Sequence, residues 1–319
     1  MGKKFLNHAL GANLVRFDIF LTRCQSVEGN GTLYFGYGSN LDWADWKSWC
    51  EKKNLRYDGL VELSPCWLPN YSLKFHYFSD GRKGGAADVV ETGRGHAVPG
   101  VLFRMDDVTL EVMDLKEGTG VKAYQRREVQ VILPNGTFVD ALTYCVTNKS
   151  REDRFIQPTD TYAKLIRQGL EKRKLPIGEL KNAIENFSPS YPLEKIFVYG
   201  TLMHGEQRYS SMVECSNGEG LSASARGTLL DLGNYPGMIA GDEGVIQGEV
   251  YQIDQVYLTL QTLDSIEGFY GYDSPHSLFT RTIIQIDTEH GPEWAWTYVY
   301  NKEDEIEYTT IDSGDWRNR

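Results

Sequence analysis

The sequence has few of the residues that build metal sites and disulfide frameworks. Its 319 residues include five cysteines and six histidines, and the cysteines are widely spaced without a C-x-x-C pair. An odd number of separated cysteines argues against a disulfide scaffold and for a reducing compartment. Histidines that stand alone argue against a zinc site. We therefore expect no bound metal and a cytoplasmic location.

The sequence also lacks an excess of positive charge and a long hydrophobic run. Asp and Glu outnumber Lys and Arg by 44 to 33, which gives a net charge of −11. Nucleic acids and anionic membranes select clustered Lys and Arg, which are scattered here, so we expect neither partner. The apolar run at residues 9–15 is interrupted by Asn13 and is too short to cross a bilayer. We interpret residues 1–30 as an N-terminal extension.

The composition that remains is that of an ordinary globular protein. Hydrophobic residues make up 41% of the chain and charged residues 24%, and 319 residues suffice for two domains with separate cores.

One stretch carries a strand directly into a glycine-rich turn: Tyr34-Phe35-Gly36-Tyr37-Gly38-Ser39-Asn40-Leu41. Glycine has no Cβ, so backbone N–H groups in such a turn can approach a small anion. The short polar side chains that follow suit the start of a helix. Taken alone, such a pattern is better explained by an ordinary strand end before a capped helix.

The same pattern returns in the second half, where residues 195–198 lead into Tyr199-Gly200-Thr201-Leu202. Later segments also match in order: residues 98–106 with 246–254, 113–118 with 263–268, and 143–146 with 297–300. Matching elements in the same order predict two copies of one domain. We place the first copy at 31–187 with a helical pair at its end, a linker at 188–192, and a shorter copy at 193–319.

Local patterns predict the elements of the first copy. We expect a helix at residues 42–53 whose tryptophans (Trp43, Trp46, Trp49) lie in the core, and strands within 60–78. Five glycines in residues 79–96 predict a mobile loop or tight turns. Further on we expect a strand at 98–105, a helix ending at Gly118, a strand pair at 124–133 and 138–146, and two helices in 159–187 separated at Pro176.

Two glutamates stand at matching places, Glu117 and Glu267, each in an Asp-x-x-Glu-Gly string at a predicted helix end. A negative charge at the C-terminal end of a helix is unfavourable, and partial burial would raise the pKa of the carboxyl further. A carboxyl that titrates near neutrality is suited to moving protons. A surface glutamate beside a helix end is the alternative.

Together these strings resemble the γ-glutamylcyclotransferase family. The first loop has its Tyr-Gly-Ser-Asn form, and the second has the Tyr-Gly-Thr-Leu form of the avirulence-induced (AIG2-like) and butirosin-pathway branch. The resemblance implies an α+β fold in which each copy is a small mixed β-barrel flanked by helices. It implies that the loops hold the α-carboxylate of a γ-glutamyl group and that Glu117 and Glu267 act as general acid/base. The loop residues concerned are Tyr34, Phe35, Gly36, Tyr37, Gly38, Ser39 and Asn40, and Tyr199, Gly200, Thr201 and Leu202.

The family also has a Tyr-x-Arg string, which Tyr124-Gln125-Arg126 matches in the first copy. The second copy has Phe279 at the tyrosine position. Either Tyr270 or Tyr272 supplies a hydroxyl there, or the second copy has a different substrate or weak activity. We therefore expect the first copy to turn over simple γ-glutamyl compounds faster.

The reaction that the resemblance implies is an intramolecular aminolysis without a cofactor. The substrate's α-amine attacks its own γ-carbonyl, which forms 5-oxoproline and releases an amine or an amino acid. Two alternatives stay open: a non-catalytic module that binds γ-glutamyl compounds, and an ordinary amide hydrolase that releases glutamate. No Gly-x-Ser-x-Gly string or Cys–His pair supports the hydrolase. The leaving amine and the oligomeric state stay open.

Overall fold

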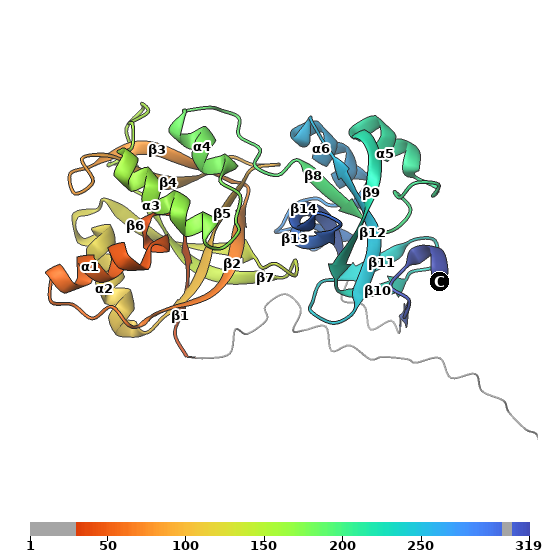
Figure 1. Cartoon of the computed structure of the whole chain (residues 1–319), viewed down its shortest axis with the longest axis horizontal. Helices are drawn as coiled ribbons and strands as arrows, with labels where there is room; N and C mark the ends of the chain where they lie inside the picture. The colour runs from red at the N-terminus through yellow and green to blue at the C-terminus, as the bar shows by residue number, and fades with distance from the viewer. Residues whose placement is uncertain (1–29, 302–307) are drawn as a thin grey trace, which may run out of the picture.

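A closed five-stranded barrel forms the centre of the first half of the protein (Figure 1). The computed structural model describes residues 30–301 and 308–319. The strands follow one another in the order β1-β5-β2-β6-β7, and β1 runs antiparallel to β5 and parallel to β7. Their bounds are β1 Thr32–Gly36, β2 Leu60–Pro69, β5 Ala97–Met105, β6 Tyr124–Ile132 and β7 Phe138–Val146.

Four helices gather around this barrel, and short polar side chains set where they begin. The caps Asp42, Asp106 and Thr159 each accept a hydrogen bond from a backbone N–H in the first turn of the helix that follows. Gly118 ends α2 in the left-handed conformation, with φ of 66°, as its sequence position predicts. The helices are α1 Trp43–Lys52, α2 Asp107–Glu117, α3 Asp160–Glu171 and α4 Gly178–Ile184, with 3₁₀ turns at Ser39–Leu41 and Thr119–Val121.

The prediction of a loop or tight turns over residues 79–96 holds for the turns at 80–83 and 94–95 but is wrong for residues 84–91. This region contains β4 (Gly84–Glu91), which pairs with β3 (Tyr71–Ser79) in a two-stranded sheet, and most of β4 is buried. Its glycines allow another segment to pass close by, since a Cβ on Gly85 would lie 2.0 Å from the carbonyl oxygen of Ile156. These glycines therefore belong to a strand against which another segment of the chain packs closely.

The tryptophans of α1 are only partly in the core. Trp46 is fully buried, and its Nε1 donates to the carbonyl of Tyr57 at 2.9 Å. Trp43 at the first position of the helix is 44% exposed, although the sequence pattern predicted it inside. Its ring packs against Tyr57 in a T-shaped arrangement.

The second half repeats the barrel. Strand β8 (Lys195–Val198) runs antiparallel to β12 and parallel to β14, as β1 does with β5 and β7, and the order is β12-β8-β14-β13-β9. The remaining strands are β9 Asn217–Arg226, β12 Val245–Gln252, β13 Phe279–Thr288 and β14 Gly291–Tyr300. The helices are α5 Tyr209–Cys215 and α6 Val256–Glu267, with a 3₁₀ turn at Trp316–Asn318. A small sheet, in the order β11-β10-β15, consists of β10 Thr228–Asp231, β11 Pro236–Ile239 and β15 Thr309–Thr310.

The architecture confirms the predicted α+β class, with a mixed, closed barrel and flanking helices in each half. The chain passes from one barrel to the other between the end of α4 and the start of β8. The domain boundaries, including the linker at 188–192, stay predictions. The proposed N-terminal extension, apart from residue 30, lies outside the described residues.

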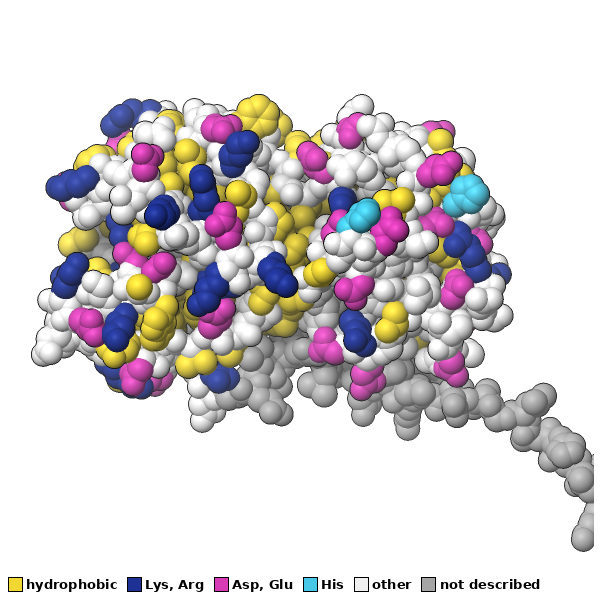
Figure 2. Space-filling view, in the orientation of Figure 1, with side chains coloured by type: hydrophobic (Ala, Val, Ile, Leu, Met, Phe, Trp, Pro, Cys, Tyr) yellow, Lys and Arg dark blue, Asp and Glu magenta, His cyan; other side chains and the backbone are white. Residues whose placement is uncertain are grey.

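The turn between β6 and β7 packs against the second barrel. The carbonyl of Pro134 accepts a hydrogen bond from the backbone N–H of Gln285 at 2.8 Å. The carbonyl of Gly136 accepts one from the hydroxyl of Thr282 at 2.7 Å, and Thr282 is fully buried. Hydrophobic side chains are visible along the seam between the two barrels in Figure 2. The halves therefore share a contact that includes backbone groups of both.

Figure 2 also shows Lys and Arg side chains interspersed with Asp and Glu over the face that it presents. Among the residues that the structure describes, no helix is long and apolar enough to cross a membrane.

Candidate active site

The two glycine loops lie at the same place in their barrels, between the first strand and the helical segment that follows. In the first, the hydroxyl of Tyr37 donates to the backbone carbonyl of Tyr144 on β7 at 2.5 Å. In the second, the hydroxyl of Tyr199 donates to the carbonyl of Tyr298 on β14 at 2.7 Å. The preceding strands are fixed in the same way, with bonds of 2.9 Å from Thr143 to the Phe35 carbonyl and from Thr297 to the Phe197 carbonyl.

Both loops leave backbone donors uncommitted. Within the described ranges, the N–H groups of Ser39 and Asn40 have no acceptor, and neither do those of Thr201 and Leu202. Adjacent free N–H groups in a glycine turn form a concave site that suits an anion. The two loops can therefore bind the same kind of group.

Glu117 lies beside the first loop. Its Oε1 accepts a hydrogen bond from Nδ2 of Asn40 at 2.9 Å, and the same amide donates to the hydroxyl of Tyr34 at 2.9 Å. The Nζ of Lys116 donates to the amide oxygen of Asn40. Asn40 thus joins the loop, the barrel and the end of α2.

A group of charged side chains surrounds this loop. Arg82, at the tip of the β3–β4 hairpin, donates to both carboxylate oxygens of Asp45 at 2.8 and 2.6 Å and to the hydroxyl of Ser39 at 2.9 Å. The Nζ of Lys116 lies 3.7 Å from Asp45, and burial lowers the pKa of this lysine. Burial opposes ionisation of Asp45, but the hydrogen bonds from Arg82 hold the pKa of its carboxyl below the usual value. The first loop is therefore bordered by fixed positive and negative charges.

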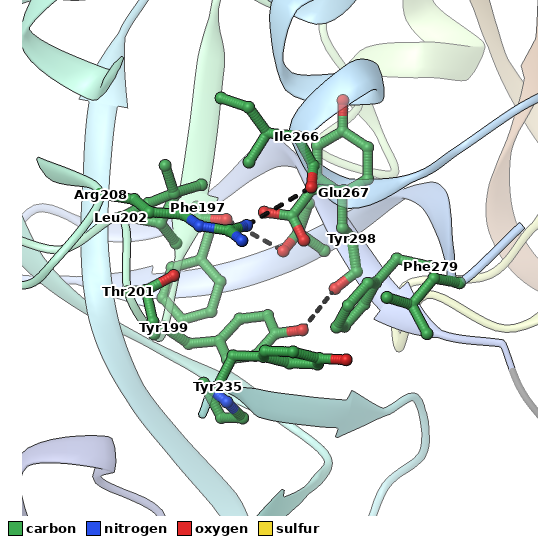
Figure 3. Close-up of a pocket in the computed structure, with 15 residues that line it drawn as sticks. Phe197, Tyr199, Thr201, Leu202, Arg208, Tyr235, Ile266, Glu267, Phe279 and Tyr298 are labelled. Atoms are coloured by element: carbon green, nitrogen blue, oxygen red, sulfur yellow. Dashed lines mark hydrogen bonds between the residues drawn. The ribbon is translucent and has the colours of Figure 1, made fainter. Parts of the chain in front are cut away.

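Glu267 lies in an open cavity of about 80 Å³ in the second copy (Figure 3). The cavity is lined by residues 197–202 of the loop region, by Ile266 and Glu267, and by side chains of the surrounding strands. This volume exceeds the roughly 10–15 Å³ that one water requires on the same measure. The cavity therefore brings together the second loop and its glutamate.

The carboxyl group of Glu267 stands in a weakly polar setting. No hydrogen-bond donor among the described residues reaches it. Burial raises its pKa to about 7, against the opposing charge of Arg208. The direction agrees with the expectation from the helix end, but burial is the main cause. Glu267 can therefore exchange a proton near neutral pH.

Arg208 connects the loop to the helix end. Its backbone N–H donates to the carbonyl of Thr201 at 2.7 Å, and its Nη1 donates to the carbonyl of Ile266 at 3.4 Å (Figure 3). A guanidinium near the last carbonyls of a helix is favoured by the helix dipole.

Tyr124, whose hydroxyl was expected to act at the first site, is hydrogen-bonded to the backbone instead. The hydroxyl of Tyr124 donates to the carbonyl of Ala87 on β4 at 2.8 Å. Phe279 holds the corresponding place in the second barrel, since Tyr124 pairs with Val146 and Phe279 with Tyr300 at the ends of matching strand pairs. Phe279 lines the cavity without a polar group.

The tyrosines expected to replace that phenol do not line the cavity. Tyr270 is 73% exposed, and the ring of Tyr272 packs against Phe269 and Phe138. Tyr235 lines it instead, from the turn between β10 and β11 (Figure 3). The chain position of Tyr235, far from the Asp-x-x-Glu-Gly string, gave no sequence signal for this role.

An Asp-Arg-Tyr cluster accompanies each glutamate, and the sequence argument missed it. Asp264 stands one helical turn before Glu267 and accepts hydrogen bonds from Arg281 at 2.6 and 2.5 Å and from the hydroxyl of Tyr298 at 2.8 Å. The first copy repeats this with Asp114, Arg126 and Tyr144, at 2.9, 2.5 and 2.8 Å. The recurrence of the aspartate in both strings, and of Thr-Tyr in both last strands, was the available signal.

The remaining predicted loop residues belong to the barrel wall. Phe35 is fully buried and its ring packs on Tyr37, with centroids 6.0 Å apart. Gly36 ends β1, and a Cβ there would lie 2.9 Å from the ring of Phe103. Phe35 and Gly36 therefore belong to the strand that leads into the loop. Their role at the site, like that of the other predicted site residues, stays a proposal.

Comparison with known proteins identifies a matching family. The family described as "Gamma-glutamyl cyclotransferase, AIG2-like" matches residues 34–164 and 196–318. The gamma-L-glutamyl-butirosin B gamma-glutamyl cyclotransferase of Niallia circulans is 35% identical over 116 residues, which are 36% of this chain and 72% of that protein. The gamma-glutamylcyclotransferase of Bos taurus is 30% identical over 167 residues, 50% of this chain and 82% of that protein.

Among solved structures, a gamma-glutamyl cyclotransferase is 25% identical, with 50% of this chain and 90% of that chain covered at a TM-score of 0.41. The family match extends over both halves and most of the described residues. The chain therefore belongs to the AIG2-like gamma-glutamyl cyclotransferase family, and each of its two barrels carries one matched segment.

Proposed function

We propose that the protein converts a γ-glutamyl amide into 5-oxoproline and a free amine or amino acid, without a cofactor. The observation that carries the proposal is the second cavity, where Glu267, with a pKa of about 7, shares one space with the loop Tyr199–Leu202. A proton shuttle works best when its pKa lies near the operating pH. The names of the relatives, among them a gamma-glutamylaminecyclotransferase of Rattus norvegicus at 30% identity, support the substrate class.

In this mechanism the loop binds the α-carboxylate of the substrate. The free N–H groups of Thr201 and Leu202 donate to it. The substrate then folds so that its α-amine faces its own γ-carbonyl, and both reacting groups come from one molecule.

Glu267 moves the proton that the cyclisation displaces. The carboxylate takes a proton from the α-amine as the new N–C bond closes the five-membered lactam. It returns that proton to the leaving nitrogen as the amide C–N bond breaks. No net proton is gained or lost by the protein, so one glutamate completes the cycle.

The first copy offers the same parts in a more polar setting. Glu117 would be the shuttle, the N–H groups of Ser39 and Asn40 would hold the carboxylate, and Asn40 orients Glu117 through the bond of 2.9 Å. We therefore assign one site to each proposed domain, 31–187 and 193–319.

We also propose that the protein is located in the cytoplasm. Four described cysteines, Cys50, Cys66, Cys145 and Cys215, carry free thiols, which fits a reducing compartment.

The proposal is tested by identifying the product. The wild type, Glu117→Gln, Glu267→Gln and the double variant are assayed with γ-glutamyl amino acids and γ-glutamyl amines, and 5-oxoproline and glutamate are measured separately. Each single change should lower 5-oxoproline formation at its own site by roughly 10²- to 10⁴-fold, the usual contribution of general acid–base catalysis. Glutamine keeps the shape of the side chain and cannot take up the proton.

Two exposed glutamates serve as matched controls. Glu111→Gln lies on the same helix as Glu117, and Glu219→Gln lies on β9 of the second barrel. Neither should change the rate. Full activity in the double variant would exclude the glutamate mechanism, release of glutamate would favour a hydrolase, and binding without turnover in the wild type would favour a non-catalytic module.

A further inference from the structure

An arginine of the first half binds the helix that carries the second glutamate. Arg94 lies in the turn between β4 and β5, and its Nε donates to Oδ2 of Asp264 on α6 at 2.8 Å. Its guanidinium carbon lies 5.3 Å from the ring centroid of Tyr257, in the first turn of the same helix. Arg94 thus contacts α6 at two points about two turns apart.

The neighbouring backbone fits closely against the same helix. A Cβ added to Gly95 would lie 3.2 Å from a methyl of Val256 and 3.1 Å from the ring of Tyr191. Gly95 has a φ of 83°, a conformation that glycine adopts easily. The turn is therefore shaped to bring Arg94 to α6 at close range.

Asp264 is the centre of a continuous set of contacts to the second loop. It accepts from the hydroxyl of Tyr298, and the backbone carbonyl of Tyr298 accepts from the hydroxyl of Tyr199. Asp264 also stands one turn before Glu267 on α6. Its position therefore bears on the separation between Glu267 and the loop.

The first copy has no equivalent of Arg94. Among the described residues, the side chain of Asp114 has Arg126 and the hydroxyl of Tyr144 as its partners. The side chain of Asp114 is 27% exposed, whereas that of Asp264 is 5% exposed. Asp264 of the second site thus has a third partner, Arg94, which belongs to the first half of the chain.

We propose that Arg94 is a positioning residue for the second site, through which the first half holds α6 and its Glu267 in line with the loop at 199–202. This inference rests on the proposed function. Arg94 does not line the cavity, so its effect acts through Asp264. Because a misplacement of about 1 Å can cost roughly 10²-fold in rate, a partial release of α6 should be measurable as a loss of kcat.

The test isolates the second site in the Glu117→Gln background. Arg94→Ala should lower kcat for 5-oxoproline formation about 10-fold and leave KM within about twofold, since the loop and cavity walls that bind substrate stay intact. Arg94→Lys should recover most of the loss, because an ammonium can still pair with Asp264.

The matched control is Asn135→Ala. Asn135 also joins the two halves, through a hydrogen bond of 3.1 Å to Asp242, and its amide oxygen accepts hydrogen bonds from Thr137 within its own turn. It should leave kcat unchanged. An equal loss of kcat in Asn135→Ala, or an unchanged kcat in Arg94→Ala, would overturn the proposal.

Hydrogen exchange separates this inference from the proposed function. If the Glu117→Gln background forms no 5-oxoproline, the assignment of activity to the second site fails, but the positioning of α6 can still be measured. Arg94→Ala should then speed amide exchange along α6 (Val256–Glu267), and Asn135→Ala should not. Unchanged exchange along α6 in Arg94→Ala would reject the positioning role by itself.

Discussion

The two glutamates stand at equivalent helix ends, but their surroundings differ in polarity. Glu117 accepts from the amide of Asn40, and Lys116 donates to the same residue. Glu267 has Leu202 at the loop position that corresponds to Asn40, and it faces a cavity whose lining is mostly apolar. A single loop position thus decides whether the carboxyl is hydrogen-bonded by its own loop or left to interact with a ligand.

The difference in polarity changes which of the two sites we expect to be more active. The sequence favoured the first copy because it keeps Tyr124, but that hydroxyl is engaged by the carbonyl of Ala87. Glu267 has a pKa near neutrality and an open cavity. We therefore expect Glu267→Gln to cost more 5-oxoproline formation than Glu117→Gln, on substrates whose leaving amine fits the apolar cavity.

The largest expected difference in stability concerns the two aspartates. Asp264→Asn would leave Arg281, whose side chain is 2% exposed, without a carboxylate, and would release Arg94 as well. Breaking one partner of a buried ion pair costs roughly 3–5 kcal/mol. Asp114→Asn affects Arg126, whose side chain is 40% exposed, and should cost about 1 kcal/mol.

Urea denaturation of both variants measures this contrast as a shift of the midpoint with the slope unchanged. Equal shifts of the midpoint would mean that the buried Asp264 cluster contributes no more to stability than the more exposed Asp114 cluster.

A second, intermediate effect concerns the stability of Glu267→Gln as a function of pH. The folded pKa of Glu267 is about 7 and its ordinary value is 4.5. Between these values the folded protein keeps a proton that the unfolded chain has lost, so the wild type loses stability as pH rises from 4.5 through 7. Glutamine has no such proton. The variant should match the wild type near pH 4.5 and exceed it by about 1–3 kcal/mol at pH 8, at roughly 1.4 kcal/mol per pKa unit reduced for partial solvent access.

Thermal or urea unfolding of both proteins at several pH values checks this difference. Taking the difference removes the contribution of Glu179, whose pKa burial also raises to about 7. A variant that is no more stable at pH 8 than at pH 4.5, relative to the wild type, would mean that Glu267 titrates like an exposed carboxyl. Glu111→Gln, at an exposed position on α2, is the matched control.

The smallest expected effect is that of Tyr124→Phe. Loss of the bond to the Ala87 carbonyl should cost about 1 kcal/mol of stability. In the Glu267→Gln background, kcat/KM at the first site should change less than about threefold, because the phenol serves the backbone of β4. Tyr71→Phe, on the neighbouring β3, is the matched control. A 10²-fold loss of kcat/KM would instead mean that the Tyr124 hydroxyl takes part in the reaction. The first copy would then again be expected to be the more active one.

Much of the fold followed from local signals in the sequence. The helix ends at Gly118 and Gly268 were predictable because both residues adopt positive φ, which glycine tolerates best. The turn at residues 134–136 was predictable from Pro-Asn-Gly between two alternating runs. The repeated order of loop, strand and glutamate placed Glu117 and Glu267 beside their loops.

Features that depend on distant partners were not predictable. The bond from Arg94 to Asp264 joins residues 170 positions apart, and nothing near Arg94 in the sequence marks it. The glycines of β4 pointed to a loop, because the segment at Ile156 that crowds Gly85 comes from another part of the chain.

The turn at residues 134–136 has a consequence for how the protein is made. The first half leaves the ribosome before β13 is synthesised, and domains generally fold as they emerge. The carbonyls of Pro134 and Gly136 are then already in place when Gln285 and Thr282 reach them. A gene that encoded only the second half would leave the Gln285 amide and the Thr282 hydroxyl without these carbonyl partners. The second barrel therefore depends on the first for the acceptors of two hydrogen bonds from β13.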